Sequence, residues 1–361
     1  MGQNPTSGVL SLQRRRDIYA LCQKYDILIV EDDPYWYLQF PTATSQNTTT
    51  TSDPANTSFN PDITLLTTGE PRPEHWKSSG FDFLDSLVPS YINIDTDGRV
   101  LRLDTFSKTV APGCRLGWIT AQPALVERIL RITECSTQQP SGFVQSMIAE
   151  LIMGPQGSHD PGQGGAADGS GWKVDGWVRW LEGLRGNYER RMQVMCNTLD
   201  AHSELVRSGR RKSLTNDMDD DEWAVVEKTQ IYSFVRPLGG MFVWVRFDFT
   251  SHPLAKVVPH ARLSQALWIF WTQKPYLCLV APGGMFAANQ KIREEDSYNC
   301  FRLCFAACPA EQVKDISTRF AEGAQGFWRI KKKEKIDKLL EDEDAAGTNH
   351  VDGMAVLTGM C

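Results

Sequence analysis

The chain has 361 residues, of which 41% are hydrophobic, and its formal net charge is −6. This length suffices for one large or two medium domains, and the hydrophobic content excludes a wholly disordered chain. The acidic balance argues against a nucleic-acid-binding protein, and no apolar run approaches the roughly 18 residues that a membrane span needs.

The first forty residues predict a helix followed by a strand. Ser11 suits the N-cap of the helix, and the apolar residues Ile18 and Leu21 follow at helical spacing. The run ILIV at 27–30 predicts a buried strand. Three acids stand at the end of this strand: Glu31, Asp32 and Asp33.

Further along the first half, two predicted strands flank a lysine. Residues 100–106 (VLRLDTF) and 114–121 (CRLGWITA) are typical of strands, and residues 123–135 predict a helix. Lys108 lies in the short turn between the strands, and Arg115 follows it by seven residues.

The second half predicts one long helix and several short strands. The long helix covers 172–200 and has tryptophan and leucine side chains on one face. Strands are predicted at 241–247, 277–283 and 300–306, a helix at 310–324, and a charged helical tail from Lys331. Two polar segments, 42–60 and 154–171, predict flexible connections, and 208–222 predicts a charged surface loop.

The cysteines do not predict a metal site. Cys300, Cys304 and Cys308 are four residues apart, as ligands on a helix would be, but the run FRLCFA at 301–306 is typical of a strand. The nine cysteines are an odd number, and no secretory signal is evident. We therefore expect reduced thiols and a cytoplasmic protein.

Lys108 and Arg115 together indicate one kind of chemistry. A lysine amine is a poor nucleophile while it is protonated, so it needs a site that lowers its pKa. The planar fork of an arginine suits a phosphate group. Pyridoxal 5′-phosphate (PLP) needs a lysine for its Schiff base, a group that holds its phosphate, and an acid for its pyridine nitrogen. The alternative is that both residues are ordinary solvated surface side chains.

These residues stand in segments that resemble the class I/II, fold-type I aminotransferases, most closely the fungal aromatic amino acid and 2-aminoadipate aminotransferase branch. The similar segments spread over most of residues 1–310, and the segment around the lysine is the most specific. They are GQNPT (2–6), EDDPYW (31–36), LVPSYINIDTDGRVLRLDTFSKTVAPGCRLGWIT (87–120), STQQPSGFVQ (136–145), GGMFVWV (239–245) and FRLCFA (301–306).

The resemblance implies an α/β fold in two domains. Residues 1–195 would be the C-terminal part of a PLP-binding large domain with a mostly parallel sheet, which is incomplete here. Residues 196–330 would form a smaller α+β C-terminal domain, and 331–361 a charged tail. The flexible insertions at 42–60 and 154–171 fall in the large domain.

The resemblance also implies a role for each candidate site residue. Lys108 would be the catalytic lysine, with Thr105, Ser107 and Arg115 around the phosphate; the family more often has serine at the position of Thr105. The pyridine-binding aspartate stands three residues before the tyrosine of the DPY turn, which selects Asp32.

Three further roles follow from the same comparison. Tyr35 and Asn4 would bind the phenolic oxygen of PLP, and Arg302 would bind the substrate α-carboxylate. The alternatives are a packed core tyrosine, a plain turn asparagine, and a structural salt bridge for the arginine.

The implied activity is transfer of an amino group between an amino acid, aromatic or 2-aminoadipate, and a 2-oxo acid. We expect a homodimer that binds neither nucleic acid nor membrane. The family's upstream strand, glycine-rich phosphate loop and gating segment have no counterpart in this sequence. A truncated, catalytically impaired relative or a ligand-binding module is therefore the alternative, and we expect the chain alone to bind PLP weakly.

Overall fold

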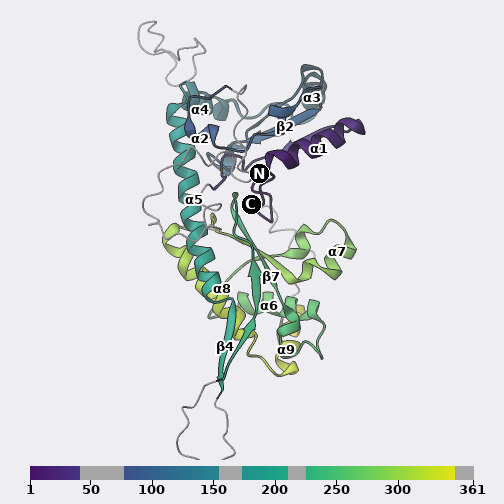
Figure 1. Ribbon diagram of the computed structural model, residues 1–361, viewed down its shortest axis with the longest axis vertical. Helices are drawn as coiled ribbons and strands as arrows, with labels where there is room; N and C mark the ends of the chain where they lie inside the picture. The colour runs from purple at the N-terminus through teal and green to yellow at the C-terminus, as the bar shows by residue number, and fades with distance from the viewer. Residues whose placement is uncertain (41–76, 154–172, 210–224, 346–361) are drawn as a thin grey trace, which may run out of the picture. The chain divides into compact units, whose positions relative to one another are not determined.

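The computed structural model describes residues 1–40, 77–153, 173–209 and 225–345 (Figure 1). Two compact units make up the chain. The first contains Met1–Arg190 together with Pro237–Met241, and the second contains Arg191–Arg236 together with Phe242–Cys361. The segments predicted as flexible at 42–60 and 154–171, and most of 208–222, lie outside the described residues.

The first unit contains short strands and surrounding helices. Its strands are β1 (Ile29–Asp32), β2 (Val100–Thr105) and β3 (Gly117–Thr120). Its helices are α1 (Leu12–Lys24), α2 (Asp82–Asp85), α3 (Pro123–Cys135) and α4 (Gly142–Met153), with 3-10 turns η2 (Tyr91–Ile94) and η3 (Pro112–Cys114). The long helix α5 (Asp175–Ala201) begins in this unit and ends in the second.

The three strands form one sheet in the order β1-β2-β3. β1 runs parallel to β2, with Asp32 opposite Leu103, and β3 runs antiparallel to β2, with Gly117 opposite Thr105. Because parallel strands point the same way, the carboxyl ends of β1 and β2 lie at one edge of the sheet. Ligands of α/β proteins bind at such edges.

The predicted burial of residues 27–30 is wrong, although a strand is present. Ile29 packs against a cluster of Tyr19, Tyr91 and Val100. Val30, which points to the opposite face, is 62% exposed. Side chains alternate between the faces of a strand, and only one face of β1 is covered within the described residues.

Residues 237–241 complete the first unit from far along the chain. The Phe40 amide donates to the Leu238 carbonyl at 2.9 Å, and the Gly240 amide donates to the Leu38 carbonyl at 2.7 Å. A Cβ atom on Gly239 would lie 2.6 Å from the Leu38 carbonyl oxygen, which explains the glycine there.

The second unit contains a four-stranded antiparallel sheet, a separate strand pair and three larger helices. The sheet has the order β6 (Tyr232–Phe234), β7 (Phe242–Phe247), β9 (Cys300–Cys304), β8 (Ala281–Pro282), and the pair is β4 (Glu204–Gly209) with β5 (Val225–Gln230). The helices are α6 (His260–Thr272), α8 (Val313–Phe327) and α9 (Lys333–Ala345), with the shorter α7 (Gln290–Glu295). The remaining 3-10 turns are η4 (Phe249–Ser251), η5 (Gly283–Phe286), η6 (Ser297–Asn299) and η7 (Ala310–Gln312).

Aromatic side chains form the core of the second unit. Trp271 on α6 stacks on Phe320 of α8 with 4.4 Å between ring centroids, and it meets Phe301 of β9 edge-on at 5.0 Å. A Cβ atom on Gly323 would lie 2.6 Å from the Trp271 ring, so α8 can approach α6 this closely only with glycine there. α9 packs on α6 in turn.

The strand predicted at 300–306 is confirmed as β9, whereas the one predicted at 277–283 is wrong for most of its length. Only Ala281–Pro282 is paired. The Cys278 amide donates to the Trp271 carbonyl at 2.8 Å, and the Trp268 indole donates to the Val280 carbonyl at 2.8 Å. These hydrogen bonds to α6 take the place of the bonds to a neighbouring strand that the predicted strand would have made. Among the described helices, none combines the length and apolar character that crossing a bilayer requires.

Candidate active site

The turn that carries Lys108 begins where β2 ends and is anchored on both sides. The Phe106 amide donates to the Leu116 carbonyl at 3.1 Å, which closes the segment between β2 and β3. The buried Phe106 ring lies 4.9 Å from that of Trp118. From α5, the Trp180 indole donates to the Thr109 carbonyl at 2.7 Å. The backbone on either side of the lysine is therefore fixed by packing and hydrogen bonds.

Two hydroxyl groups and an arginine belong to the same segment as Lys108. The Thr105 hydroxyl donates to the Ser107 hydroxyl at 2.9 Å and accepts from the Ser107 amide at 3.1 Å. Arg115 follows η3 in the left-handed region, with φ 46°, and its side chain is exposed. The Leu116 carbonyl accepts the hydrogen bond from the Phe106 amide that closes this segment. Arg115 directly precedes Leu116, so it lies next to that bond.

The three acids at the end of β1 differ in exposure. Glu31 and Asp33 are buried, whereas Asp32 between them is exposed. Side chains alternate between the two faces of a strand, which explains this pattern. Within the described part of the chain, Asp32 has no hydrogen-bond or ion-pair partner, so its carboxylate remains available to a ligand.

Glu31 is fully engaged inside the protein. Its carboxylate accepts from the Arg15 guanidinium, from the Ser90 hydroxyl at 2.6 Å and from the Tyr91 amide at 3.0 Å. Arg15 also lies over the Tyr91 ring at 4.7 Å. This network ties α1 and η2 to β1 and fixes the strand on whose opposite face Asp32 stands.

Asp33 joins the N-terminal segment to the same strand end. Its carboxylate accepts from the Met1 ammonium at 2.6 Å, while burial raises the pKa of Asp33. Asn4 lies in the exposed turn that follows Met1. The N-terminal segment is thus held at the carboxyl end of β1.

Tyr35 is the candidate residue that the structure brings to Lys108. The Lys108 ammonium nitrogen lies 5.9 Å from the centroid of the Tyr35 ring, and the ring is buried. The phenol and the amine come from the ends of the two parallel strands.

Seven candidate residues thus belong to the first unit: Asn4, Asp32, Tyr35, Thr105, Ser107, Lys108 and Arg115. Arg302 lies on β9 in the second unit, where its guanidinium carbon is 4.3 Å from the Phe242 ring centroid and 4.9 Å from that of Phe286. Both rings are within the range of a cation–π interaction with the guanidinium. Its role toward substrate stays a prediction.

Sequence reasoning missed the residues that support the site. The Arg15–Glu31 pair has no local motif, since the partners are sixteen residues apart. Trp180 was predicted on a helix face, but its bond to Thr109 depends on tertiary packing. Across the described residues, no group of histidine, cysteine or acidic side chains is suited to a metal ion.

Many cofactor enzymes are α/β proteins that carry a lysine in a turn at the carboxyl edge of parallel strands. Comparison with known proteins identifies the family of this chain. Residues 3–320 match the model of the family "Aminotransferase class I and II". The chain therefore belongs to this family, which depends on PLP.

Individual relatives agree. The chain is 34% identical over 251 residues to an L-tyrosine:2-oxoglutarate aminotransferase, atrD, of Tapinella panuoides, covering 70% of this chain and 36% of the relative. It is 29% identical over 336 residues to an aromatic amino acid aminotransferase of Schizosaccharomyces pombe, covering 93% and 55%.

Among solved structures, aminotransferase Aro8 from Candida albicans has a TM-score of 0.63 and 31% identity, with 91% of this chain and 56% of that chain covered. The predicted fold-type I α/β architecture is confirmed. The chain spans between about a third and just over half the length of these relatives.

Proposed function

We propose that this protein is a PLP-dependent aminotransferase that exchanges an amino group between an aromatic amino acid and a 2-oxo acid. The observation that carries the proposal is the edge of the β1–β2 pair, where Asp32 ends one strand and Thr105 leads from the other into Lys108. Family membership supports it, and so do the activities for which the relatives from Tapinella panuoides and Schizosaccharomyces pombe are named.

The side chains at this edge fit the cofactor's chemistry. A phosphate needs donors, and the Thr105 and Ser107 hydroxyls stand beside Arg115 in the same turn. A protonated pyridine nitrogen needs an exposed carboxylate, which only Asp32 of the three acids offers. PLP, when bound, supplies an electron-accepting ring that stabilises negative charge at the substrate Cα.

In this proposal each residue acts through its own group. The Lys108 amine would take the proton from the substrate Cα as a general base and deliver it, as a general acid, to the cofactor carbon that keeps the amino group. The Tyr35 phenol and the Asn4 amide would donate to the cofactor's phenolic oxygen, and Arg302 would orient the substrate by binding its α-carboxylate with a bidentate fork. Amino-group transfer then runs in two half-reactions, with a 2-oxo acid released and another one consumed.

Among substrates, we favour aromatic amino acids because the relatives are named as tyrosine and aromatic amino acid aminotransferases. 2-Aminoadipate is the alternative. Homodimerisation and a cytoplasmic location stay predictions.

The test is covalent labelling of the lysine. The chain is incubated with PLP, reduced with borohydride and digested, and the labelled peptide is identified by mass spectrometry. The label should lie on Lys108 and disappear in Lys108→Arg. Lys24→Arg, which removes an exposed lysine of α1, is the control and should leave the labelling unchanged. A label on other lysines alone would contradict the assignment.

Substrate choice is tested separately. Phenylalanine, tyrosine and 2-aminoadipate are each supplied with 2-oxoglutarate, and glutamate formation is measured. Faster turnover of 2-aminoadipate than of either aromatic amino acid would refute the preferred substrate.

A further inference from the structure

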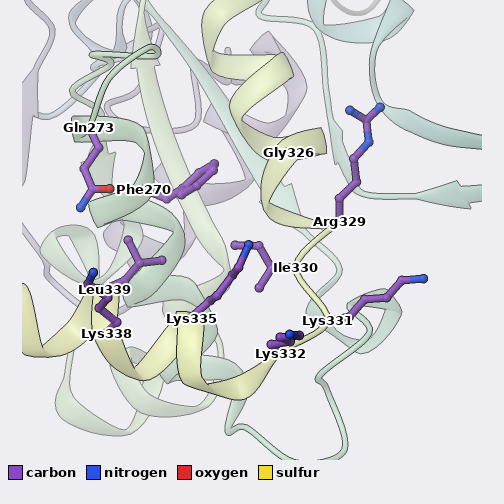
Figure 2. Close-up of a pocket in the computed structure, with 10 residues that line it drawn as sticks. All are labelled: Phe270, Gln273, Gly326, Arg329, Ile330, Lys331, Lys332, Lys335, Lys338 and Leu339. Carbon is purple, nitrogen blue, oxygen red and sulfur yellow. The ribbon is translucent and has the colours of Figure 1, made fainter.

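A cavity of about 700 Å³ in the second unit contains none of the candidate active-site residues. Four segments build it: the end of α6, the end of α8, the turn that follows α8, and helix α9 (Figure 2). The volume falls within the range of roughly 300–1,000 Å³ that is typical of small-molecule sites.

The lining is strongly basic. Five of the ten lining residues are cations: Arg329, Lys331, Lys332, Lys335 and Lys338. In the part of the chain that the structure describes, none of the five has an ion-pair or side-chain hydrogen-bond partner. No acidic residue lines the cavity, so its cations favour the binding of an anion.

Helix α9 separates its charges by face. Lys335 and Lys338 line the cavity, whereas Glu334 and Asp337 do not. Asp337 instead pairs with Arg262 at 3.6 Å and with Lys333 at 3.8 Å. Asp337 therefore pairs with two cations outside the cavity and with neither Lys335 nor Lys338.

The rest of the lining is mainly apolar. Phe270, Ile330 and Leu339 contribute hydrocarbon or aromatic surface, and Gln273 adds an amide that can donate and accept hydrogen bonds. In Figure 2 the Lys335 side chain points toward Ile330. A ligand that fits this lining has an anionic part and a ring or apolar part.

We propose that this cavity binds a small organic polyphosphate, a nucleoside triphosphate or a compound of the same chemistry. The lysines and Arg329 bind the phosphates, while Phe270, Ile330 and Leu339 contact the ring. Several phosphates suit the site because more than one lysine lines the cavity. A concave site of this size on a chain of net charge −6 favours a small molecule over an extended polyanion.

The test measures ATP binding to the whole 361-residue chain by isothermal titration calorimetry at low ionic strength. ATP should bind with one-to-one stoichiometry and more tightly than either tripolyphosphate or adenosine. In the double variant Lys335→Glu with Lys338→Glu, the dissociation constant should rise at least about tenfold, because two charge-assisted contacts become repulsive. Both side chains are exposed, so the fold should persist, which circular dichroism checks.

The matched control places the same charge change elsewhere on the second unit. Lys256→Glu with Lys291→Glu reverses two exposed lysines outside the cavity and should alter ATP affinity less than about twofold. Equal weakening in both double variants would overturn the proposal, because it would show a general charge effect.

A second control separates this cavity from the proposed active site. Arg115→Ala should leave ATP binding unchanged, so loss of binding in that variant would assign the nucleotide to the Lys108 turn and overturn the proposal. Absence of ATP binding, or tripolyphosphate binding as tightly as ATP, would overturn it too. The proposal would also be overturned if anionic lipid vesicles or single-stranded RNA bound through Lys335 and Lys338 and ATP did not displace them.

Discussion

The buried Arg15–Glu31 pair allows a quantitative prediction about the strand that carries Asp32. The two side chains are 3% and 6% exposed. Glu31→Leu would leave three donors without their acceptor: the Arg15 guanidinium, the Ser90 hydroxyl and the Tyr91 amide. Removing one partner of a buried ion pair costs about 3–5 kcal/mol of stability. Because Glu31→Leu leaves three donors without an acceptor, we expect a cost of about 5 kcal/mol.

The converse change should cost less. In Arg15→Leu the Glu31 carboxylate keeps the Ser90 and Tyr91 donors, so we expect about 3 kcal/mol. The double variant removes both charges together, and its cost should fall at least about 2 kcal/mol below the sum of the single costs. An asymmetric pair of single effects with a strongly non-additive double is the signature of this network.

Hydrogen exchange of peptides that cover β1 measures the local opening free energy in the first unit without assuming that the whole chain unfolds in one step. Arg14→Leu is the control, since Arg14 is an exposed neighbour on the same helix and should cost under about 0.5 kcal/mol. A Glu31→Leu cost below about 1.5 kcal/mol, or additive single effects, would refute the reasoning.

Three further predictions concern single side chains. Arg302→Lys keeps the charge but loses the fork, so amino-acid binding should weaken by about 2–5 kcal/mol; unchanged affinity in a spectroscopic titration would make Arg302 structural. Trp180→Phe removes the 2.7 Å hydrogen bond to the Thr109 carbonyl, so amide hydrogen exchange in the Lys108 turn should accelerate about fivefold, which corresponds to about 1 kcal/mol of local opening free energy. An unchanged exchange rate would show that this bond does not hold the turn. Burial lowers the pKa of His252 from 6.5 to about 4, so the unfolded state binds the extra proton. Stability of the second unit should therefore be full above about pH 6.5 and fall by about 2–3 kcal/mol as the pH drops to about 4. A similar loss in His252→Gln, measured by denaturant unfolding, would exclude His252 as its source.

The features that the sequence predicted correctly depend on local chemistry. The helix at 123–135 begins at a proline, and its bounds are confirmed as α3. The choice of Asp32 over its neighbours came from its spacing to Tyr35; Asp32 is the exposed one of the three acids, and its role stays a prediction. The order strand, lysine turn, strand needed only the pattern of residues 100–121.

The features that it missed depend on tertiary context. The run at 277–283 looks like a strand because it is apolar, yet apolar character predicts burial and not the partner of each amide; here the partners lie on α6. Helix α6 itself was missed, since the aromatic run at its end suits strand and helix equally. The exposure of Val30 was unforeseeable because a strand's pattern does not say which of its faces is covered.

The return of residues 237–241 to the first unit has a consequence for synthesis on the ribosome. The bonds of Leu238 and Gly240 to residues 38–40 can form only after about 50 residues beyond Arg190 have been made. At roughly 5–20 residues per second this delay is on the order of 3–10 s. During that interval the nascent first unit has its lysine turn but lacks its last strand-like segment, so chaperones have a window in which to bind it.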